Sequence, residues 1–298
     1  MRAPKPSGAK DGTMDEASSE ACMDLPVVTV TAANLPAAWE QAVIATWERG
    51  ARIATQYDRP EDPPSRDAMA VITVLDPFAE PRIHKAMPCG ITDLEAYRQE
   101  VVDGIHDHWI DPAAGKWEYT YHERLARYSV PGLEQPIDQM AYVVDALAAT
   151  PHTRRAQATT WKPWEDAGCV DPACLQRLWF RVFGDRLVLH ADMRSNDAFR
   201  ASFMNMYAFT DLQRHVASQL SARLGRTIRA GQYIHTASSF HIYGSNHEEF
   251  DAFLESVRKR TFEQRTYRTD VIAPLIEEAR AEIAASLRRE AETGRKGL

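Results

Sequence analysis

The stretch DPACLQRLWFRVFGDRLVLHADMRSND, residues 171–197, contains the clearest pattern in the chain. Two largely apolar segments, residues 174–185 and 186–195, meet at the pair Gly184-Asp185. A glycine followed by aspartate is typical of the two-residue turn that joins antiparallel strands. We therefore predict a β-hairpin over this stretch.

Further strands are predicted on both sides of this hairpin. Before it lie AMAVITVL (residues 68–75) and RRAQATTWK (residues 154–162), and after it lies AGQYIHTASSFHIYG (residues 230–244). Short runs of β-branched and alternating apolar residues, bounded by Pro, Gly and charged residues, are typical of strands.

The spacing of apolar residues predicts five helices. Asn34 is expected to cap the first, while Thr92 and Gly104 are expected to cap and to end the second. The predicted ranges are 34–55, 92–104, 137–149, 197–224 and 246–289. This alternation of strands and helices predicts an α+β fold, with one sheet and helices packed against a face.

Composition excludes several classes of protein. The chain has 298 residues and a net charge of −7, too acidic for general attraction to nucleic acid or to an anionic membrane. Its apolar runs are too short for a membrane span, and the first residues lack the apolar core of a signal peptide. We predict a disordered tail over residues 1–25, one domain over residues 26–298, and a cytoplasmic location.

The cysteine pattern favours neither disulfides nor zinc. The four cysteines are Cys22, Cys89, Cys169 and Cys174. They are few for this length, and Cys169 and Cys174 have no matching CxxC or HxxxH partner. We predict no disulfide framework and no metal site.

Three clusters carry candidate chemistry: Arg154-Arg155, Cys174 with residues 194–197, and residues 241–243. Their order and spacing resemble the thymidylate synthase superfamily, through four motifs. PHTRRAQATTW is similar to the family's Arg-Arg strand. DPACLQRLWFRVFGDRLVLHADMRSND is similar to its Pro-x-Cys nucleophile followed by Arg-Ser-x-Asp. FMNMYAFTDLQRHVASQL resembles its asparagine-containing helix, and SSFHIYGSNH resembles its His-x-Tyr strand. The four motifs occur in the family's order and span most of the chain.

The resemblance implies both a fold and a reaction. The fold would be a catalytic domain with a large twisted mixed sheet and helices on one face, forming a homodimer through the sheets. Cys174 would add to C6 of a pyrimidine nucleoside monophosphate. C5 would then attack the methylene of 5,10-methylenetetrahydrofolate. A thiolate needs a nearby cation, and Arg194 matches the family arginine that contacts both sulfur and phosphate.

The resemblance also assigns the phosphate contacts. Arg194 and Ser195 would bind the phosphate from the same subunit, while Arg154 and Arg155 would reach it from the partner subunit. Arg66 resembles the arginine of an early phosphate loop, with Arg59 as the alternative. Arginine suits this task because its planar fork matches phosphate oxygens.

The remaining ligand contacts follow in the same way. Asn205 would read the edge of the base, and His241 and Tyr243 would bind the sugar. Asp197 would hydrogen-bond the folate pterin, with Trp109 beside it. Asp197 could instead be a helix N-cap.

Two departures from the family bear on the product. His106 stands where synthases have the first tryptophan of a Trp-Asp-x-Trp stretch, and the chain ends in the charged sequence EAETGRKGL. Both changes favour a wetter site, in which water captures the exocyclic methylene and a hydroxymethyl group results. Glu100 resembles the family glutamate that organises water near the base. If this helix is aligned with the family by counting back from Gly104 without a gap, Tyr97 takes that position instead.

The favoured interpretation is a folate-dependent pyrimidine nucleotide hydroxymethylase, acting on dCMP, CMP or dUMP. The alternative enzyme is thymidylate synthase, which methylates dUMP and releases dihydrofolate. A third hypothesis is a catalytically inactive homologue that binds nucleotides. The sequence does not decide whether the base of the substrate is uracil or cytosine, or whether its sugar is ribose or deoxyribose.

Overall fold

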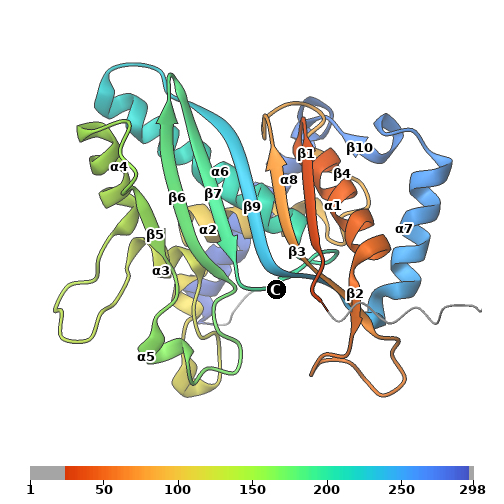
Figure 1. The fold of residues 1–298 in the computed structure, drawn as a ribbon. Coiled ribbons are helices and arrows are strands. Elements are labelled where there is room, and N and C mark those ends of the chain that lie inside the picture. The colour runs from red at the N-terminus through yellow and green to blue at the C-terminus, as the bar shows by residue number, and fades with distance from the viewer. Residues whose placement is uncertain (1–23, 295–298) are drawn as a thin grey trace, which may run out of the picture.

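The computed structural model describes residues 24–294, and a large mixed sheet forms the framework of the fold (Figure 1). The strands of this sheet are β1 Val27–Ala32, β2 Ala51–Ile53, β3 Ser65–Val74, β5 Gln157–Thr159, β6 Leu175–Phe183, β7 Arg186–Met193, β8 Asn196–Asp197 and β9 Arg229–Ile242. Their order is β1-β3-β9-β7-β6-β5, with β2 paired to β3 and β8 paired to β9. The predicted tail, residues 1–25, lies outside the described residues except for its last two positions.

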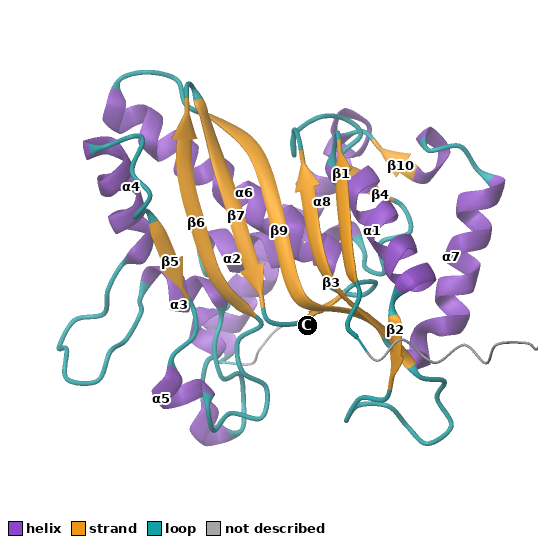
Figure 2. Cartoon of the chain, in the orientation of Figure 1, coloured by secondary structure: helices purple, strands orange, loops and turns teal. Residues whose placement is uncertain are grey.

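Helices cover one face of this sheet. The α-helices are α1 Leu35–Arg49, α2 Ile91–Asp103, α3 Tyr121–Ala126, α4 Gln139–Ala149, α5 Pro163–Asp166, α6 Ser202–Leu224, α7 His247–Lys259 and α8 Thr269–Thr293. Short 3-10 turns are η1 Asp107–Trp109, η2 Pro112–Ala114, η3 Gly244–Asn246 and η4 Glu263–Arg265, and β4 Ile83–His84 pairs with β10 Thr266–Tyr267. Figure 2 shows α2, α6 and α8 behind the strands, whose other face is turned toward the viewer. The predicted α+β class is confirmed.

Strand β9 is the central element for the site. It runs antiparallel to β3 and parallel to β7 and β8. In this register His241 lies opposite Asp67 of β3 and also opposite Asp197 of β8. Three polar residues from segments far apart in the sequence therefore meet at one end of the sheet.

Two local predictions are confirmed. The hairpin forms between β6 and β7, and Gly184 adopts φ of 63° in its turn, a backbone region that glycine enters without steric cost. Asn34 caps α1, because its side-chain oxygen accepts a hydrogen bond from the N–H of Ala37 at 3.1 Å.

Two predicted helix ends are wrong. The first helix ends at Arg49 rather than at residue 55, because residues 51–53 pair with β3 instead. Gly50 permits this change of direction, since a Cβ there would lie 2.4 Å from the carbonyl oxygen of Thr46. Thr92 lies inside α2, whose N-cap is Gly90; the Asp93 carboxylate accepts from the Gly90 N–H at 2.9 Å.

The later helices also differ from prediction. The helix placed at residue 197 begins at Ser202, because Asp197 belongs to β8. The helix predicted over residues 246–289 is broken between α7 and α8. Within the break, the guanidinium of Arg265 is buried and pairs with both carboxylate oxygens of Glu40, at 2.8 and 2.7 Å. A continuous helix would not carry Arg265 into this ion pair.

The core lies between the sheet and the helices. Its buried residues form one contiguous cluster that includes Trp39, Phe180, Phe203 and Phe240. Within residues 24–294, no helix combines the length and apolar character of a membrane span.

Candidate active site

A cavity of about 490 Å³ opens beside Cys174, just before β6. We call it the thiol cavity. It brings together five residues that the sequence singled out: Cys174, Arg194, Ser195, His241 and Tyr243. Its other lining residues are Thr55, Gln56, Tyr57, Asp67, Val170, Asp171 and Ser239.

Arg194 is held close to the thiol by the backbone. Its Nε donates to the carbonyl of Ala173 at 3.1 Å, its Nη2 donates to that of Pro172 at 2.5 Å, and its own N–H bonds the carbonyl of Cys174 at 2.8 Å. Burial raises the pKa of Cys174 above its usual value, and the positive charge of Arg194 opposes that rise. The thiol of the free protein is therefore protonated at neutral pH.

Tyrosines from the thiol cavity and from a second cavity surround this thiol. Tyr97, Tyr119, Tyr121 and Tyr243 all interact electrostatically with Cys174, and burial raises the pKa of each phenol. The second cavity, here the tyrosine cavity, has a volume of about 440 Å³. Its lining residues are Tyr97, Glu100, Lys116, Trp117, Glu118, Tyr119, Thr120, Tyr121 and Asp171. Asp171 lines both cavities, so they are neighbours.

Both candidates for the water-organising position line the tyrosine cavity. The hydroxyl of Tyr97 donates to Oδ1 of Asn205 at 2.5 Å, which links the cavity to the predicted base-reading residue. Glu100 lies one helical turn further along α2, and its Oε2 is 2.8 Å from Nδ1 of His106. Tyr97 thus contacts Asn205, while Glu100 contacts the imidazole.

His106 and Trp109 form a flat stack, with ring centroids 3.8 Å apart and planes 13° apart. Nε1 of Trp109 donates to Oε1 of Glu290 in α8 at 2.7 Å. The stack lines a third cavity, of about 460 Å³, between α2 and α8 rather than the thiol cavity. Glu290 could not be predicted from the sequence, because nothing in its local pattern distinguishes it from the other acidic residues of the helix.

Asp197 is a largely buried carboxylate at the end of β8. Its Oδ1 accepts from the N–H groups of Phe199 at 3.0 Å and Arg200 at 2.7 Å, so it caps the turn before α6 rather than the helix itself. Burial raises its pKa from 3.8 to about 6. Among the described residues Oδ2 has no hydrogen-bond partner, which leaves it available to a ligand.

The early strand places Asp67, rather than Arg66, in the thiol cavity. Successive residues of a strand point to opposite faces. Asp67 lines the cavity, whereas the guanidinium of Arg66 lies 5.4 Å from the ring centre of Trp47. The loop that lines the cavity through Thr55, Gln56 and Tyr57 continues to Arg59. The phosphate role of Arg66 or Arg59 stays a prediction.

Arg154 and Arg155 are exposed and do not line the thiol cavity. They precede edge strand β5, and the carbonyl of Arg154 accepts from Nε1 of Trp179 at 3.0 Å. Trp179 alternates along β6 with the buried residues Leu178 and Phe180, so it points to the face of the sheet away from the core. The arginine pair therefore lies beside that face.

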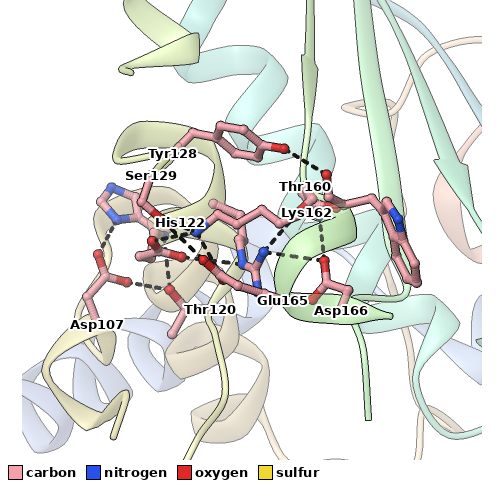
Figure 3. A network of polar contacts seen from close by, with 12 residues as sticks. Asp107, Thr120, His122, Tyr128, Ser129, Thr160, Lys162, Glu165 and Asp166 are labelled. Carbon is pink, nitrogen blue, oxygen red and sulfur yellow. Dashed lines mark hydrogen bonds and ion pairs between the residues drawn. The ribbon is translucent and has the colours of Figure 1, made fainter. Parts of the chain in front are cut away.

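A buried polar network anchors the segment that leads to Cys174 (Figure 3). Arg124 of α3 pairs with Asp166 at 3.0 Å, and Lys162 contacts Glu123 at 3.2 Å. Thr160 donates to the carbonyl of Leu175, the residue after the nucleophile candidate. Buried charges are tolerated where they are paired in this way.

The described residues contain no cluster of side chains that could hold a metal ion. Cys89, Cys169 and Cys174 are free thiols, and Cys22 lies outside the described residues.

Comparisons with known proteins relate the chain to a known family. A family model described as thymidylate synthase matches residues 89–274. The chain is 31% identical over 182 residues to a "Putative thymidylate synthase" of Methanopyrus kandleri, covering 61% of this chain and 79% of that protein. It is 23% identical over 228 residues to a protein of the same name from Methanosarcina acetivorans, covering 76% and 95%. It is 31% identical over 171 residues to a "Thymidylate synthase" of Haloferax volcanii, covering 52% and 47%.

Proposed function

Because the chain belongs to the thymidylate synthase family, we propose that it transfers one carbon from 5,10-methylenetetrahydrofolate to C5 of a pyrimidine nucleoside monophosphate. The observation that carries this proposal is the thiol cavity, in which Cys174, Arg194 and His241 face one space. A nucleophile, a phosphate-binding cation and a hydroxyl-binding imidazole in one cavity fit a nucleotide better than they fit any isolated structural role.

Each residue of the cavity has a role in this proposal. The Cys174 thiolate adds to C6 and makes C5 a nucleophile. Arg194 and Ser195 bind the phosphate, and the nearby guanidinium favours the thiolate. His241 and Tyr243 bind the sugar. Asn205, held by Tyr97, reads the base.

Two features support folate binding, at separate places in the fold: Asp197 lies at the end of β8, and the His106–Trp109 stack lines the cavity between α2 and α8. The free Oδ2 of Asp197 can accept hydrogen bonds from a pterin, and the stacked rings of His106 and Trp109 offer a flat surface. This cosubstrate supplies the methylene that becomes the new substituent at C5.

We propose hydroxymethylation as the outcome. Glu100 and His106 form a hydrogen-bonded pair at 2.8 Å, and Glu100 lines the tyrosine cavity next to Cys174. Such a pair can remove a proton from water as the oxygen attacks the exocyclic methylene. The balance is nucleotide plus methylenetetrahydrofolate plus water, giving hydroxymethyl nucleotide and tetrahydrofolate. No oxidant or reductant is consumed.

Methylation is the second candidate, and the names of the relatives favour it. In that reaction a hydride from the folate replaces the attack by water, and dihydrofolate is released. The His106–Glu100 pair favours attack by water on the exocyclic methylene. Hydride transfer is instead favoured where aromatic side chains exclude water from the site.

We also propose a homodimer with shared sites. Arg154 and Arg155 lie beside the sheet face away from the core, where a second copy could receive them. Neither arginine lines the thiol cavity of its own subunit, which is consistent with both arginines binding the phosphate in the partner subunit's cavity.

The proposal is tested by release of tritium from 5-tritiated dUMP, dCMP, UMP and CMP, each incubated with methylenetetrahydrofolate. Folate-dependent release from one or more nucleotides is expected. If none of the four releases tritium while nucleotides still bind, the inactive-homologue hypothesis replaces the enzyme.

A further inference from the structure

Three polar side chains form a row along one wall of the thiol cavity. Oγ of Ser239 lies 3.0 and 2.9 Å from the two carboxylate oxygens of Asp67, and 3.1 Å from Nδ1 of His241. Ser239 and His241 are two apart on β9 and therefore share a face. Asp67 reaches the same wall from the neighbouring strand β3.

The direction of these hydrogen bonds follows from what each group can donate. Asp67 is met by donors alone: the hydroxyl of Ser239 and the backbone N–H groups of Ala68 and Phe240. Burial raises the pKa of Asp67 above its usual value, and these three donors oppose that rise because they stabilise the ionised carboxylate. The ionised carboxylate accepts hydrogen bonds but cannot donate them. The single hydroxyl proton of Ser239 is then committed to Asp67. Its oxygen can only accept from His241, so the ring proton lies on Nδ1.

We propose that Asp67, acting through Ser239, holds His241 in the Nδ1–H tautomer and so presents Nε2 as a hydrogen-bond acceptor to the substrate. Asp67 is a positioning residue, since it acts on the ligand through two other groups. The recognised feature is a sugar hydroxyl that donates its proton. This identification of the ligand rests on the proposed function, whereas the tautomer itself does not.

The environment of His241 is consistent with a neutral ring. Burial of the imidazole lowers its pKa to about 4, while a hydrogen bond with the backbone of Ser239 and the charge of Asp58 oppose that fall. A neutral imidazole has one donor and one acceptor nitrogen, and in this proposal the contact between Nδ1 and Oγ of Ser239 selects Nδ1 as the donor.

His235 provides an internal reference on the same strand. Its Nδ1 is 2.8 Å from the hydroxyl of Tyr233, a group that can donate or accept, and its Nε2 is 2.9 Å from Oδ1 of Asn196, which can only accept. The amide nitrogen of Asn196 is turned toward the carbonyl of Asp197 at 3.5 Å, so an oxygen faces His235. His235 is therefore expected in the opposite, Nε2–H tautomer.

The first test is nitrogen-15 NMR of the full chain with labelled histidines, without any ligand. Protonated and bare ring nitrogens have distinct shifts, and His241→Gln and His235→Gln assign the two signals. We expect Nδ1–H for His241 and Nε2–H for His235. In Asp67→Asn the carboxamide can donate to Ser239, which frees the serine proton to reach Nδ1 and moves His241 toward Nε2–H. Ser239→Ala, a smaller change, should also release the Nδ1–H preference.

His235 should be unchanged in both variants, which shows that the fold is intact. An Nε2–H tautomer of His241 in the wild-type protein would overturn the proposal. So would an unchanged Nδ1–H signal in both variants.

The second test measures turnover of the nucleotide that the chain uses best against its 3′-fluoro analogue, which cannot donate a proton from that position. The wild-type KM should rise roughly tenfold for the analogue, the loss expected for one hydrogen bond. Asp67→Asn should raise KM for the natural nucleotide and reduce this discrimination, with a smaller change in kcat. If the wild-type protein discriminates but Asp67→Asn discriminates equally, the relay is overturned. If no pyrimidine nucleotide binds at all, the proposed function fails while the NMR result still decides the tautomer.

Discussion

Tyr97 and Asn205 are joined by a hydrogen bond in which the phenol donates to the side-chain oxygen of the amide, 2.5 Å away. Burial raises the pKa of Tyr97 well above its usual value, so the phenol keeps its proton. This bond orients the Asn205 amide with its oxygen toward Tyr97 and its nitrogen away from it. It also separates the roles of Tyr97 and Glu100, because Glu100 points to His106 instead.

Tyr97→Phe and Glu100→Gln should therefore impair different steps. Loss of the phenol releases the Asn205 amide, so KM for the nucleotide should rise roughly tenfold, the value of one hydrogen bond. Glu100→Gln should lower kcat by roughly 10²-fold or more, as expected for a general base, with little change in nucleotide KM. Steady-state kinetics separates the two effects. Glu118→Gln is the matched control, because Glu118 lines the same cavity. A Glu100→Gln variant with wild-type kcat would remove Glu100 from the chemistry.

Cys174→Ser should abolish both product formation and tritium release while nucleotide binding survives. A hydroxyl is too weak a nucleophile at neutral pH to replace the thiolate. Tritium release and calorimetric binding measure the two properties separately. Cys89→Ser and Cys169→Ser are the controls and should retain activity, since neither cysteine lines the thiol cavity. Exchange above about a hundredth of the wild-type rate in Cys174→Ser would mean that another group is the nucleophile.

The sequence predicts β3, β5, β6, β7 and β9 of the sheet but not β1, β2 or β8, and the features that it predicts correctly have local signals. The hairpin from Gly184 and the cap at Asn34 depend on residues adjacent in the chain. The break between α7 and α8 depends instead on Arg265 pairing with Glu40, 225 positions away. Helical periodicity carries no information about such a partner.

The site shows the same division. Motif order places Cys174, Arg194, Ser195, His241 and Tyr243, and the structure brings all five to one cavity. Asp67 and Ser239 were not predicted as site residues, because their roles arise from the pairing of β3 with β9. The one signal that was present is strand alternation, which sends Asp67 to the face opposite Arg66.

A homodimer with shared phosphate sites should recover activity by subunit exchange. Cys174→Ser lacks the nucleophile and Arg155→Ala lacks a donor from the partner, so mixed dimers would contain one intact site. We expect the mixture of the two inactive proteins to regain activity in a rate assay. A mixture of Cys174→Ser and Cys174→Ala is the control and should stay inactive. No recovery, with exchange demonstrated by mass-tagged subunits, would contradict shared sites.

Asp197 should make the protein less stable as pH rises through its titration. Its pKa is 3.8 when unperturbed and about 6 in the fold, so the folded state binds the proton more tightly. The free energy of unfolding should therefore fall between about pH 4 and pH 6 and stay lower above, by about 3 kcal/mol from this group. Denaturant titrations of wild type and Asp197→Asn should converge at low pH. The variant should be the more stable protein at pH 7, yet should have lost folate-dependent activity. Equal pH dependence in both proteins would contradict this assignment.

The fate of the folate tests the central claim most directly. The chain is incubated with methylenetetrahydrofolate and the nucleotide that releases tritium, and both products are identified by mass spectrometry and absorbance. The Glu100–His106 pair predicts tetrahydrofolate and a nucleotide heavier than the substrate by CH2O. His106→Trp replaces the polar imidazole by an apolar indole that excludes water, so it should raise the amount of any methylated side product. Stoichiometric dihydrofolate together with a methylated nucleotide from the wild-type protein would contradict hydroxymethylation and establish methylation instead.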